Sequence, residues 1–170
     1  DVYKRQVDAF VERRNGKIDA EGAKKLVLED KNYFGTMLVY MKKASGLVSG
    51  ACHSTANTVR PALQIIKMKK PFKKTSGVFV MMKGTERYIF TDCAINIAPT
   101  SEDIAENAII SYDTAKAFGI DEPKIALLSF STKGSASSPE VDKVADALKL
   151  IKEQAPNLVI CLLYTSLMAR

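Results

Sequence analysis

The residues best suited to chemistry lie together in one run of small polar side chains, from Ser49 to Arg60. Ser54, Thr55 and Thr58 carry hydroxyl groups that can donate hydrogen bonds to an anion, and Arg60 can hold a phosphate through two parallel N–H bonds. If a helix begins here, the free N–H groups of its first turn and its dipole add to this attraction. The run therefore predicts an anion site. Helix N-capping, for which Ser, Thr and Asn are the usual residues, explains the pattern equally well.

Two short elements must position this run. The apolar pair Leu47 and Val48 before it predicts a short buried strand. After it, Pro61 predicts the start of a helix that continues to about Ile66, because proline lacks an N–H and is tolerated in a first helical turn but not further along. Proline also disfavours helical geometry in the residue before it. The pattern therefore places Arg60 at the junction of loop and helix, where it can face a bound anion.

A second polar loop, between residues 129 and 140, carries Ser131, Thr132 and Lys133. It follows a continuous apolar run that predicts a parallel strand covered on both faces, over residues 124–130. Ligands in open α/β sheets bind beyond the carboxyl ends of strands, so these side chains can contact a phosphate-bearing ligand. The loop is not a P-loop, since the order GxxxxGK[ST] is absent. From the pattern alone, an ordinary connecting loop is the preferred interpretation.

Four further residues carry reactive groups. Cys52 and His53 are adjacent in the sequence. Neighbouring side chains in a loop tend to point apart, so a Cys–His nucleophile pair is disfavoured. Both residues are instead expected to line the anion site. Asp92 falls in a predicted strand, where a carboxylate needs either a structural partner or a place in a cleft; the pattern favours neither. Cys93 is expected to be a small buried hydrophobe.

Periodicity and turn residues predict an α/β chain in two parts, residues 7–70 and 75–160, divided near Pro71. In the second part, strands and helices alternate, which predicts layers with right-handed crossovers. The break lies in the lysine-rich run Lys67–Lys74, which is interpreted as a solvated connection in preference to a nucleic-acid patch. The expected helices cover residues 8–14, 20–29, 33–43, 61–66, 101–118 and 139–154. The expected strands after Pro71 cover residues 76–82, 88–96, 124–130 and 158–160. The first two of these strands are expected to form an antiparallel pair that turns at Gly84.

The composition fits a soluble globular protein. The 170 residues are 46% hydrophobic and 26% charged, and no apolar run approaches the ~20 residues that a membrane span needs. The first residues do not form a secretory signal pattern. Three cysteines without CxxC spacing argue against a disulfide framework or a zinc site and indicate a reducing cytoplasm.

Both ends of the chain look foreign to the rest. The chain begins DVYKRQ, over residues 1–6, and ends CLLYTSLMAR, over residues 161–170; both resemble translated adapter sequence. We therefore expect the two ends to make few core contacts. Without their charged residues, 22 basic and 18 acidic residues remain and the net charge falls from +6 to +4. That modest excess suits anionic small substrates and is weak evidence for nucleic-acid binding.

Three separated blocks match one known family in sequence and spacing. They are NYFGTMLVYMKKASGLVSGACHSTANTVRPALQIIK, FTDCAINIAPTSEDIAENAIISYDTAKAFGI and KIALLSFSTKGS, in this order. The blocks closely resemble the phosphate acetyltransferases, of the phosphate acetyl/butyryl transferase family, and the resemblance covers about Val7 to Ile160. It implies transfer of acetyl between acetyl phosphate and coenzyme A. Coenzyme A is then a substrate, phosphate a product or substrate, and no resident cofactor or metal is needed.

The resemblance also implies an architecture and a division of the site. It implies a layered α/β/α fold with a mostly parallel sheet and two domains flanking a cleft, like isocitrate and isopropylmalate dehydrogenases. Ser54, Thr55 and Arg60 match the family's loop and are the candidates for the phosphate side, with Ser131 and Lys133 as further substrate-binding candidates. The family's aspartate base and a serine–arginine pair belong to a C-terminal segment without a counterpart here. The chain is therefore expected to be an inactive internal fragment of a cytoplasmic homo-oligomer that binds neither nucleic acid nor membrane.

Three other interpretations stay open. A phosphate butyryltransferase would share the same blocks, because acyl length depends on pocket walls that the sequence does not place. The same fold also occurs as a regulatory, non-catalytic domain of malic enzymes, which the flanking sequence would reveal. A basic binding module that uses Lys67–Lys74 would show salt-dependent DNA binding.

Overall fold

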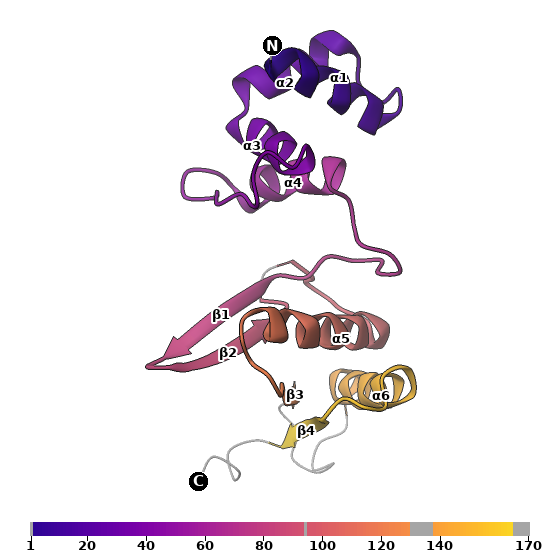
Figure 1. Ribbon diagram of the computed structural model, residues 1–170. Helices are drawn as coiled ribbons and strands as arrows, with labels where there is room; N and C mark the ends of the chain where they lie inside the picture. Colours follow the sequence, from indigo (N-terminus) through magenta and orange to yellow (C-terminus); the bar gives the residue numbers. More distant parts are fainter. Residues whose placement is uncertain (1, 94, 130–137, 165–170) are drawn as a thin grey trace. The chain divides into compact units, whose positions relative to one another are not determined.

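The computed structural model describes residues 2–93, 95–129 and 138–164, and the chain divides into two compact units, Asp1–Pro71 and Phe72–Arg170 (Figure 1). In the described residues the first unit is built from helices, and the second from helices and two small sheets. Each unit has its own hydrophobic core, so the contacts that fold it lie within it.

The first unit contains four helices: α1 (Val2–Arg14), α2 (Ala20–Glu29), α3 (Lys31–Tyr40) and α4 (Thr55–Ile65). The prediction of a helix over residues 20–29 is confirmed, and Asp19 caps this helix, since its carboxylate accepts from the Gly22 N–H at 2.9 Å. Asp30 then ends α2 and caps α3, because its carboxylate accepts from the Asn32 and Tyr33 N–H groups. Together the helices bury one apolar core, which includes Phe10, Val27, Met37 and Ile65.

The expected strand at Leu47 and Val48 does not form, and the described part of the first unit has no strand. The prediction of an α/β arrangement for residues 7–70 is therefore wrong for these residues. A strand needs a partner for its backbone N–H and C=O groups, and the surrounding helices offer none. Leu47 instead lies against Gly35 of α3, where an added Cβ would come within 2.7 Å of the leucine side chain, and Val48 is fully exposed.

The N-terminal end packs more deeply than expected. Gln6 is fully buried in the first unit, and neither its amide nitrogen nor its amide oxygen has a hydrogen-bond partner among the described residues. The expectation that residues 1–6 make few core contacts is therefore wrong for Gln6. A buried amide without partners costs about 1–3 kcal/mol, so glutamine is a poor residue for this position.

We expect Gln6→Leu to stabilise the first unit by about 1–2 kcal/mol, because it replaces an unsatisfied amide by an apolar group of similar size. Gln64→Leu is the matched control. The Oε1 of Gln64 accepts a hydrogen bond from the Tyr33 hydroxyl at 2.9 Å, so a leucine at position 64 should destabilise the unit. Urea unfolding followed by NMR signals of the first unit measures both. A loss of stability with Gln6→Leu as large as that with Gln64→Leu would contradict the unpaired amide.

The second unit combines a hairpin, a parallel strand pair and two helices. Its elements are β1 (Val78–Lys83), β2 (Glu86–Thr91), α5 (Ser101–Ala117), β3 (Ile125–Ser129), α6 (Pro139–Gln154) and β4 (Ile160–Tyr164). The predicted antiparallel hairpin is confirmed: β1 pairs with β2, and Gly84 turns the chain with a φ of +61°. Strand β3 pairs with β4 in parallel. The core between the helices and β3 is made of Ala105, Ala108, Leu127, Ala147 and Ile151.

The sheets differ from the expected architecture in three ways. One of the two strand pairs in the described residues is antiparallel, so they do not form a mostly parallel sheet. Strand β3 is covered on one face only, since Leu127 is buried against the helices while Leu128 is 70% exposed. Leu162 of β4 packs against the core, so the expectation that residues 161–170 make few core contacts is wrong for Leu162.

Candidate functional site

Helix α4 begins within the polar run that the sequence singled out. Ser54 is its N-cap: the hydroxyl oxygen accepts from the Asn57 N–H at 3.3 Å, and the Thr58 hydroxyl donates to the Ser54 carbonyl at 3.1 Å. The N–H groups of Thr55 and Ala56 have no partner in the part of the chain that the structure describes. All three residues from 54 to 56 are exposed. The first turn therefore presents two free N–H groups to solvent at the positive end of the helix dipole.

The position of Arg60 directly before a proline predicts that it lies at the start of the helix. This prediction is wrong. Arg60 lies in the second turn of α4, and Pro61 is inside the helix. Helical side chains lean toward the N-terminus of their helix, so Arg60 can still cover the first turn. Burial raises the pKa of the Tyr33 phenol, and the positive charge of Arg60 works against that rise. The exposed guanidinium of Arg60 is thus one of two cations, with Arg14, whose charge acts on Tyr33.

A buried asparagine explains how α4 accommodates Pro61. Proline has no N–H to give to the carbonyl of Asn57, four residues before it, so one helical hydrogen bond is missing. The side-chain amide of Asn32 donates to this carbonyl instead, at 3.5 Å. Asn32 is 1% exposed, and its Oδ1 accepts from the Ser49 hydroxyl. One side chain of α3 therefore holds both α4 and the loop that leads into it.

A small cavity of about 270 Å³ lies beside this link, between α3, the loop and α4. Thr36, Ser49 and Thr58 contribute its polar groups, and the remaining lining residues are aliphatic. The cavity thus adjoins the first turns of α4 and is large enough for a small substituent.

The other candidates from the sequence are not brought to this helix. Ser131 and Lys133 fall in residues 130–137, outside the described residues, so their prediction as substrate-binding residues stays a prediction. Cys52 and His53 are exposed in the loop before α4. Cys93 is exposed rather than buried, because β2 ends at Thr91 and the cysteine lies beyond the strand.

In the second unit, Asp92 is part of a polar network around the start of α5. Its backbone is left-handed, with a φ of +53°, and its carboxylate accepts from the Asn96 N–H and the Asn107 side-chain amide, both at 3.2 Å. The Asn96 amide in turn donates to the Thr75 carbonyl at 3.0 Å. These bonds favour a structural role for Asp92. It also lines the large cavity of this unit, so contact with a ligand stays open.

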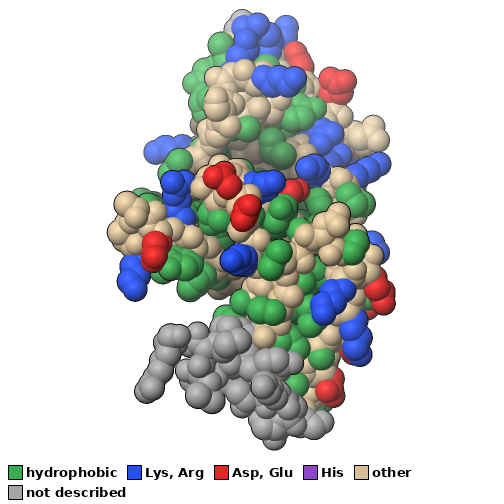
Figure 2. Space-filling model, turned by 60° about the horizontal axis from the view of Figure 1, so that its bottom comes forward, with side chains coloured by type: hydrophobic (Ala, Val, Ile, Leu, Met, Phe, Trp, Pro, Cys, Tyr) green, Lys and Arg blue, Asp and Glu red, His purple; other side chains and the backbone are tan. Residues whose placement is uncertain are grey.

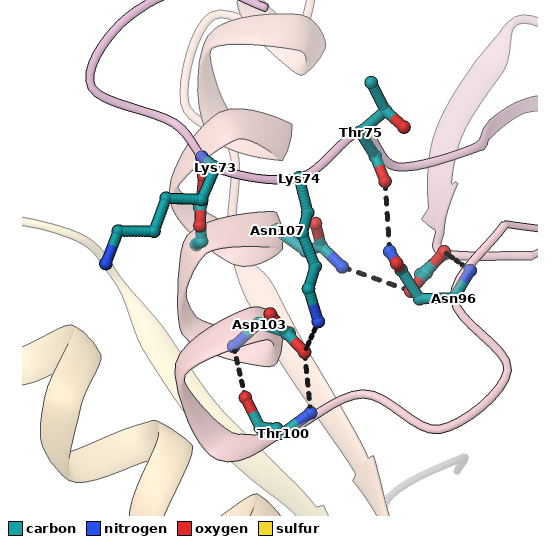
Figure 3. A network of polar contacts seen from close by, with 9 residues as sticks. Lys73, Lys74, Thr75, Asn96, Thr100, Asp103 and Asn107 are labelled. Carbon is teal, nitrogen blue, oxygen red and sulfur yellow. Dashed lines mark hydrogen bonds and ion pairs between the residues drawn. The ribbon is translucent and has the colours of Figure 1, made fainter. Parts of the chain in front are cut away.

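Asp103 organises the same network from the first turn of α5. Its carboxylate accepts from the Thr100 N–H at 2.9 Å and pairs with the Lys74 ammonium at 2.6 Å, while its own N–H donates to the Thr100 hydroxyl (Figure 3). The side chain is only 9% exposed. The hydrogen bond from Lys74, followed by that from the Thr100 backbone, lowers the pKa of Asp103 below its usual value.

We expect Asp103→Asn to destabilise the second unit by about 1–2 kcal/mol at pH 7, because it replaces a capping carboxylate by a neutral amide and leaves Lys74 without its ion-pair partner. A carboxylate whose folded pKa lies below the unfolded value of about 3.9 stabilises the fold above that pH and loses this contribution as the pH falls. The difference between variant and parent should therefore shrink as the pH falls below about 3.9. Urea unfolding followed by NMR signals of α5 measures it. Asp113→Asn, at an exposed position of the same helix, is the control and should have little effect. A pH-independent difference would contradict the ion-pair argument.

Two wider properties concern the described residues as a whole. Within residues 2–93, 95–129 and 138–164, no three His, Cys, Asp or Glu side chains are grouped so that they could hold a metal ion. Among the helices described there, none combines the length and the apolar character needed to cross a membrane.

Comparison with known proteins supplies the family. The profile described as "Phosphate acetyl/butaryl transferase" matches residues 1–161. A phosphate acetyltransferase of Bacillus subtilis (strain 168) is 66% identical over 154 residues, which are 91% of this chain and 47% of that relative. A solved phosphotransacetylase from Streptococcus pyogenes superposes with a TM-score of 0.82 and 54% identity, over 94% of this chain and 48% of that one. The EutD phosphotransacetylase from Staphylococcus aureus superposes with a TM-score of 0.80 and 55% identity, over 93% and 48%.

These matches agree on the family and on how much of a full-length relative the chain corresponds to. The chain spans about half the length of the relatives that it matches. The profile match reaches residue 1, whereas the resemblance seen in the sequence begins at Val7. Because the family profile covers nearly the whole chain, the chain belongs to the phosphate acetyl/butyryl transferase family.

Proposed function

We propose that this chain supplies the phosphate-binding half of an enzyme that transfers acetyl between acetyl phosphate and coenzyme A. The observation that carries the proposal is the open first turn of α4, with the free N–H groups of Thr55 and Ala56 and the exposed hydroxyl of Ser54. Such a turn binds anions, and Arg60 lies on the next turn of the same helix. In a chain of this family, the anion that fits is the phosphoryl group of acetyl phosphate.

The proposed reaction needs no enzyme-bound acyl group. The thiolate of coenzyme A attacks the acetyl carbonyl carbon, a C–S bond forms, the bond from carbon to the phosphate oxygen breaks, and inorganic phosphate leaves. The residues of α4 hold the phosphate and stabilise the negative charge that grows on it as it departs. Coenzyme A is a substrate here, and no resident cofactor takes part. The group that accepts the thiol proton lies outside this chain in this proposal.

The remaining candidates have defined places in the proposal. Ser131 and Lys133 hold the phosphate-bearing substrate from the loop after β3. The cavity beside Asn32 and Ser49 is a candidate place for the acetyl methyl group, since it adjoins α4. Acetyl is favoured over butyryl because the relatives that are about 60% identical or more are named phosphate acetyltransferases.

The proposal extends to the full-length protein. We propose the layered α/β/α arrangement with two domains flanking a cleft, a homo-oligomeric state and a cytoplasmic location, to which the three exposed free cysteines are suited. Nucleic acid is not a proposed partner. One member of the lysine-rich run is paired through its side chain: the Lys74 ammonium forms an ion pair with Asp103 at 2.6 Å.

A chimera tests the proposed function. The 154 matched residues of the Bacillus subtilis relative are replaced by the corresponding residues of this chain. We expect the chimera to form acetyl-CoA from acetyl phosphate and coenzyme A, and to prefer acetyl over butyryl phosphate. A folded chimera that forms neither product would contradict the proposal, and a preference for butyryl phosphate would contradict its substrate.

A further inference from the structure

The cavity of about 270 Å³ in the first unit extends along helix α4 well beyond its first turn. Helices α3 and α4 pack against each other in this unit (Figure 1), and residues of both line the cavity. On α4 and its C-cap the lining residues are Thr58, Ala62 and Ile66, which are four residues apart and so form one stripe of about 12 Å. An acetyl group held by its phosphate at the first turn fills only the beginning of this cavity.

Most of the cavity wall is aliphatic and open to solvent. Val39 of α3 and Leu47 of the loop complete the apolar lining, and Leu47 and Ile66 are both exposed. Figure 2 shows that hydrophobic side chains lie open among the Lys and Arg side chains on one face of the protein. Exposed aliphatic side chains are common on protein surfaces, so by themselves they do not mark a binding site. The polar groups of the cavity are more informative.

Three hydroxyl groups line the cavity, and two of them have already donated their hydrogen. The Ser49 hydroxyl donates to the Oδ1 of Asn32. The Thr58 hydroxyl donates to the Ser54 carbonyl at 3.1 Å. Thr36 is different: it is 3% exposed, and its hydroxyl has no hydrogen-bond partner in the part of the chain that the structure describes. A buried hydroxyl is costly without a partner, so Thr36 is the point in the cavity where the polarity of a ligand matters.

Thr36 lies one helical turn deeper in the cavity than the start of α4. Asn32, four residues before it on α3, donates to the Asn57 carbonyl in the first turn of α4. Tyr40, four residues after it, lies beside Arg13, whose guanidinium holds the last carbonyls of α4. Residues four apart share one face of a helix, so this face of α3 follows α4 from its first turn to its last. Four residues rise by about 6 Å, which places Thr36 beyond the reach of a group that stays at the first turn.

We propose that Thr36 makes the acyl site selective for acetyl by rejecting longer acyl groups, a role that rests on the proposed function. An acetyl group ends before Thr36 and leaves room for a water molecule. The oxygen atoms of Ser49 and Thr58 can still accept hydrogen bonds, so this water has partners besides the Thr36 hydroxyl.

A butyryl group is two methylene groups longer and displaces this water. Its alkyl end then covers the Thr36 hydroxyl with carbon, and the hydroxyl loses its partner. The cavity has room for the longer chain, but a polar group deep in its wall opposes the chain, so discrimination comes from polarity rather than from size.

Substitutions in the chimera test the proposal through a ratio, kcat/KM for butyryl phosphate divided by kcat/KM for acetyl phosphate. Thr36→Val removes the hydroxyl and keeps the shape of the side chain, and we expect it to raise this ratio about 10–100-fold. Thr58→Val makes the same change in the same cavity, where the hydroxyl already has a partner. It should leave the ratio nearly unchanged, because any effect on the start of α4 acts on both substrates alike.

Two kinetic results would overturn the proposal. One is an unchanged ratio with Thr36→Val. The other is an equal rise with Thr36→Ser, which keeps the hydroxyl and removes only a methyl group, because size would then set the limit. A folded parent chimera that forms neither acyl-CoA would instead contradict the proposed function.

Thermal unfolding of the same variants gives a measurement that does not need activity. Thr36→Val should not lower the Tm of the chimera, because the hydroxyl that it removes has no protein partner. Tyr33→Phe is the control, since it removes a hydroxyl that donates to Gln64 at 2.9 Å, and it should lower the Tm. A fall in Tm with Thr36→Val as large as that with Tyr33→Phe would show that the Thr36 hydroxyl is paired, and would overturn the proposal.

Discussion

The isolated chain is expected to form acetyl-CoA at least about 10³-fold more slowly than the chimera does. In this proposal the chain holds acetyl phosphate at α4, but the base that generates the thiolate and the groups that hold coenzyme A belong to the remaining half. General base catalysis alone contributes about 10²–10⁴-fold, and the loss of coenzyme A positioning adds to the deficit. The expected rate of the isolated chain is therefore close to that of the uncatalysed reaction.

Steady-state formation of acetyl-CoA measures this difference, with the chimera as the positive control. A second control is the isolated chain with an excess of acetyl phosphate, followed by NMR. Shifts of the Thr55 and Ala56 amides would show that the phosphate side is intact although turnover is absent. Robust turnover by the purified chain would contradict the division of the site between two halves. Loss of activity in a folded chimera would instead contradict the proposed function itself.

The elements that the sequence predicted best are those with local signals. The helices predicted over residues 20–29 and 139–154 form with these bounds, and Asp19 and Ser138 cap them. Thr100 and Asp103 form a capping box at the start of α5. Each of these signals acts within four residues, so its effect does not depend on how the rest of the chain folds.

The elements that the sequence misplaced depend on distant contacts. Pro61 was expected to start a helix, but Asn32 of another helix supplies the hydrogen bond that Pro61 cannot make, and α4 begins at Thr55 instead. Leu47 and Val48 have the composition of a strand, but no strand is near enough to pair with them in the described residues. Both errors have the same cause: backbone partners that lie far away in the sequence.

The candidate site shows the same limit. The sequence singled out Ser54 and Thr55 as candidates, because a run of hydroxyl residues is a local pattern, and their binding role stays a prediction. It missed Asn32, whose two contacts, with Ser49 and Asn57, cross 17 and 25 residues of sequence. The available signal was an asparagine inside an otherwise apolar helix start, at a position that the helical period places on the buried face. Such a residue needs polar partners, but the sequence does not identify them.

Arg60 is the residue of α4 whose substitution should affect catalysis most. It is exposed in the second turn and can lean over the free N–H groups of the first. A guanidinium holds phosphate by two parallel hydrogen bonds, whereas lysine offers a single point charge. A hydrogen bond to a charged group contributes about 1.5–3 kcal/mol, so losing one should lower kcat/KM for acetyl phosphate about 10–100-fold.

The measurement compares Arg60→Lys with Arg13→Lys in the chimera. Arg13 binds the other end of the same helix, where its guanidinium donates to the carbonyls of Ile65 and Ile66 at 2.6 and 3.0 Å. Arg13→Lys should therefore lower the Tm of the chimera with little change in the KM for acetyl phosphate. Arg60→Lys should do the reverse, because an exposed side chain contributes little to the fold and the phosphate contact acts only when substrate is bound. Unchanged kinetics with Arg60→Lys would exclude Arg60 from the phosphate site and leave the first-turn N–H groups of α4 to bind the anion by themselves.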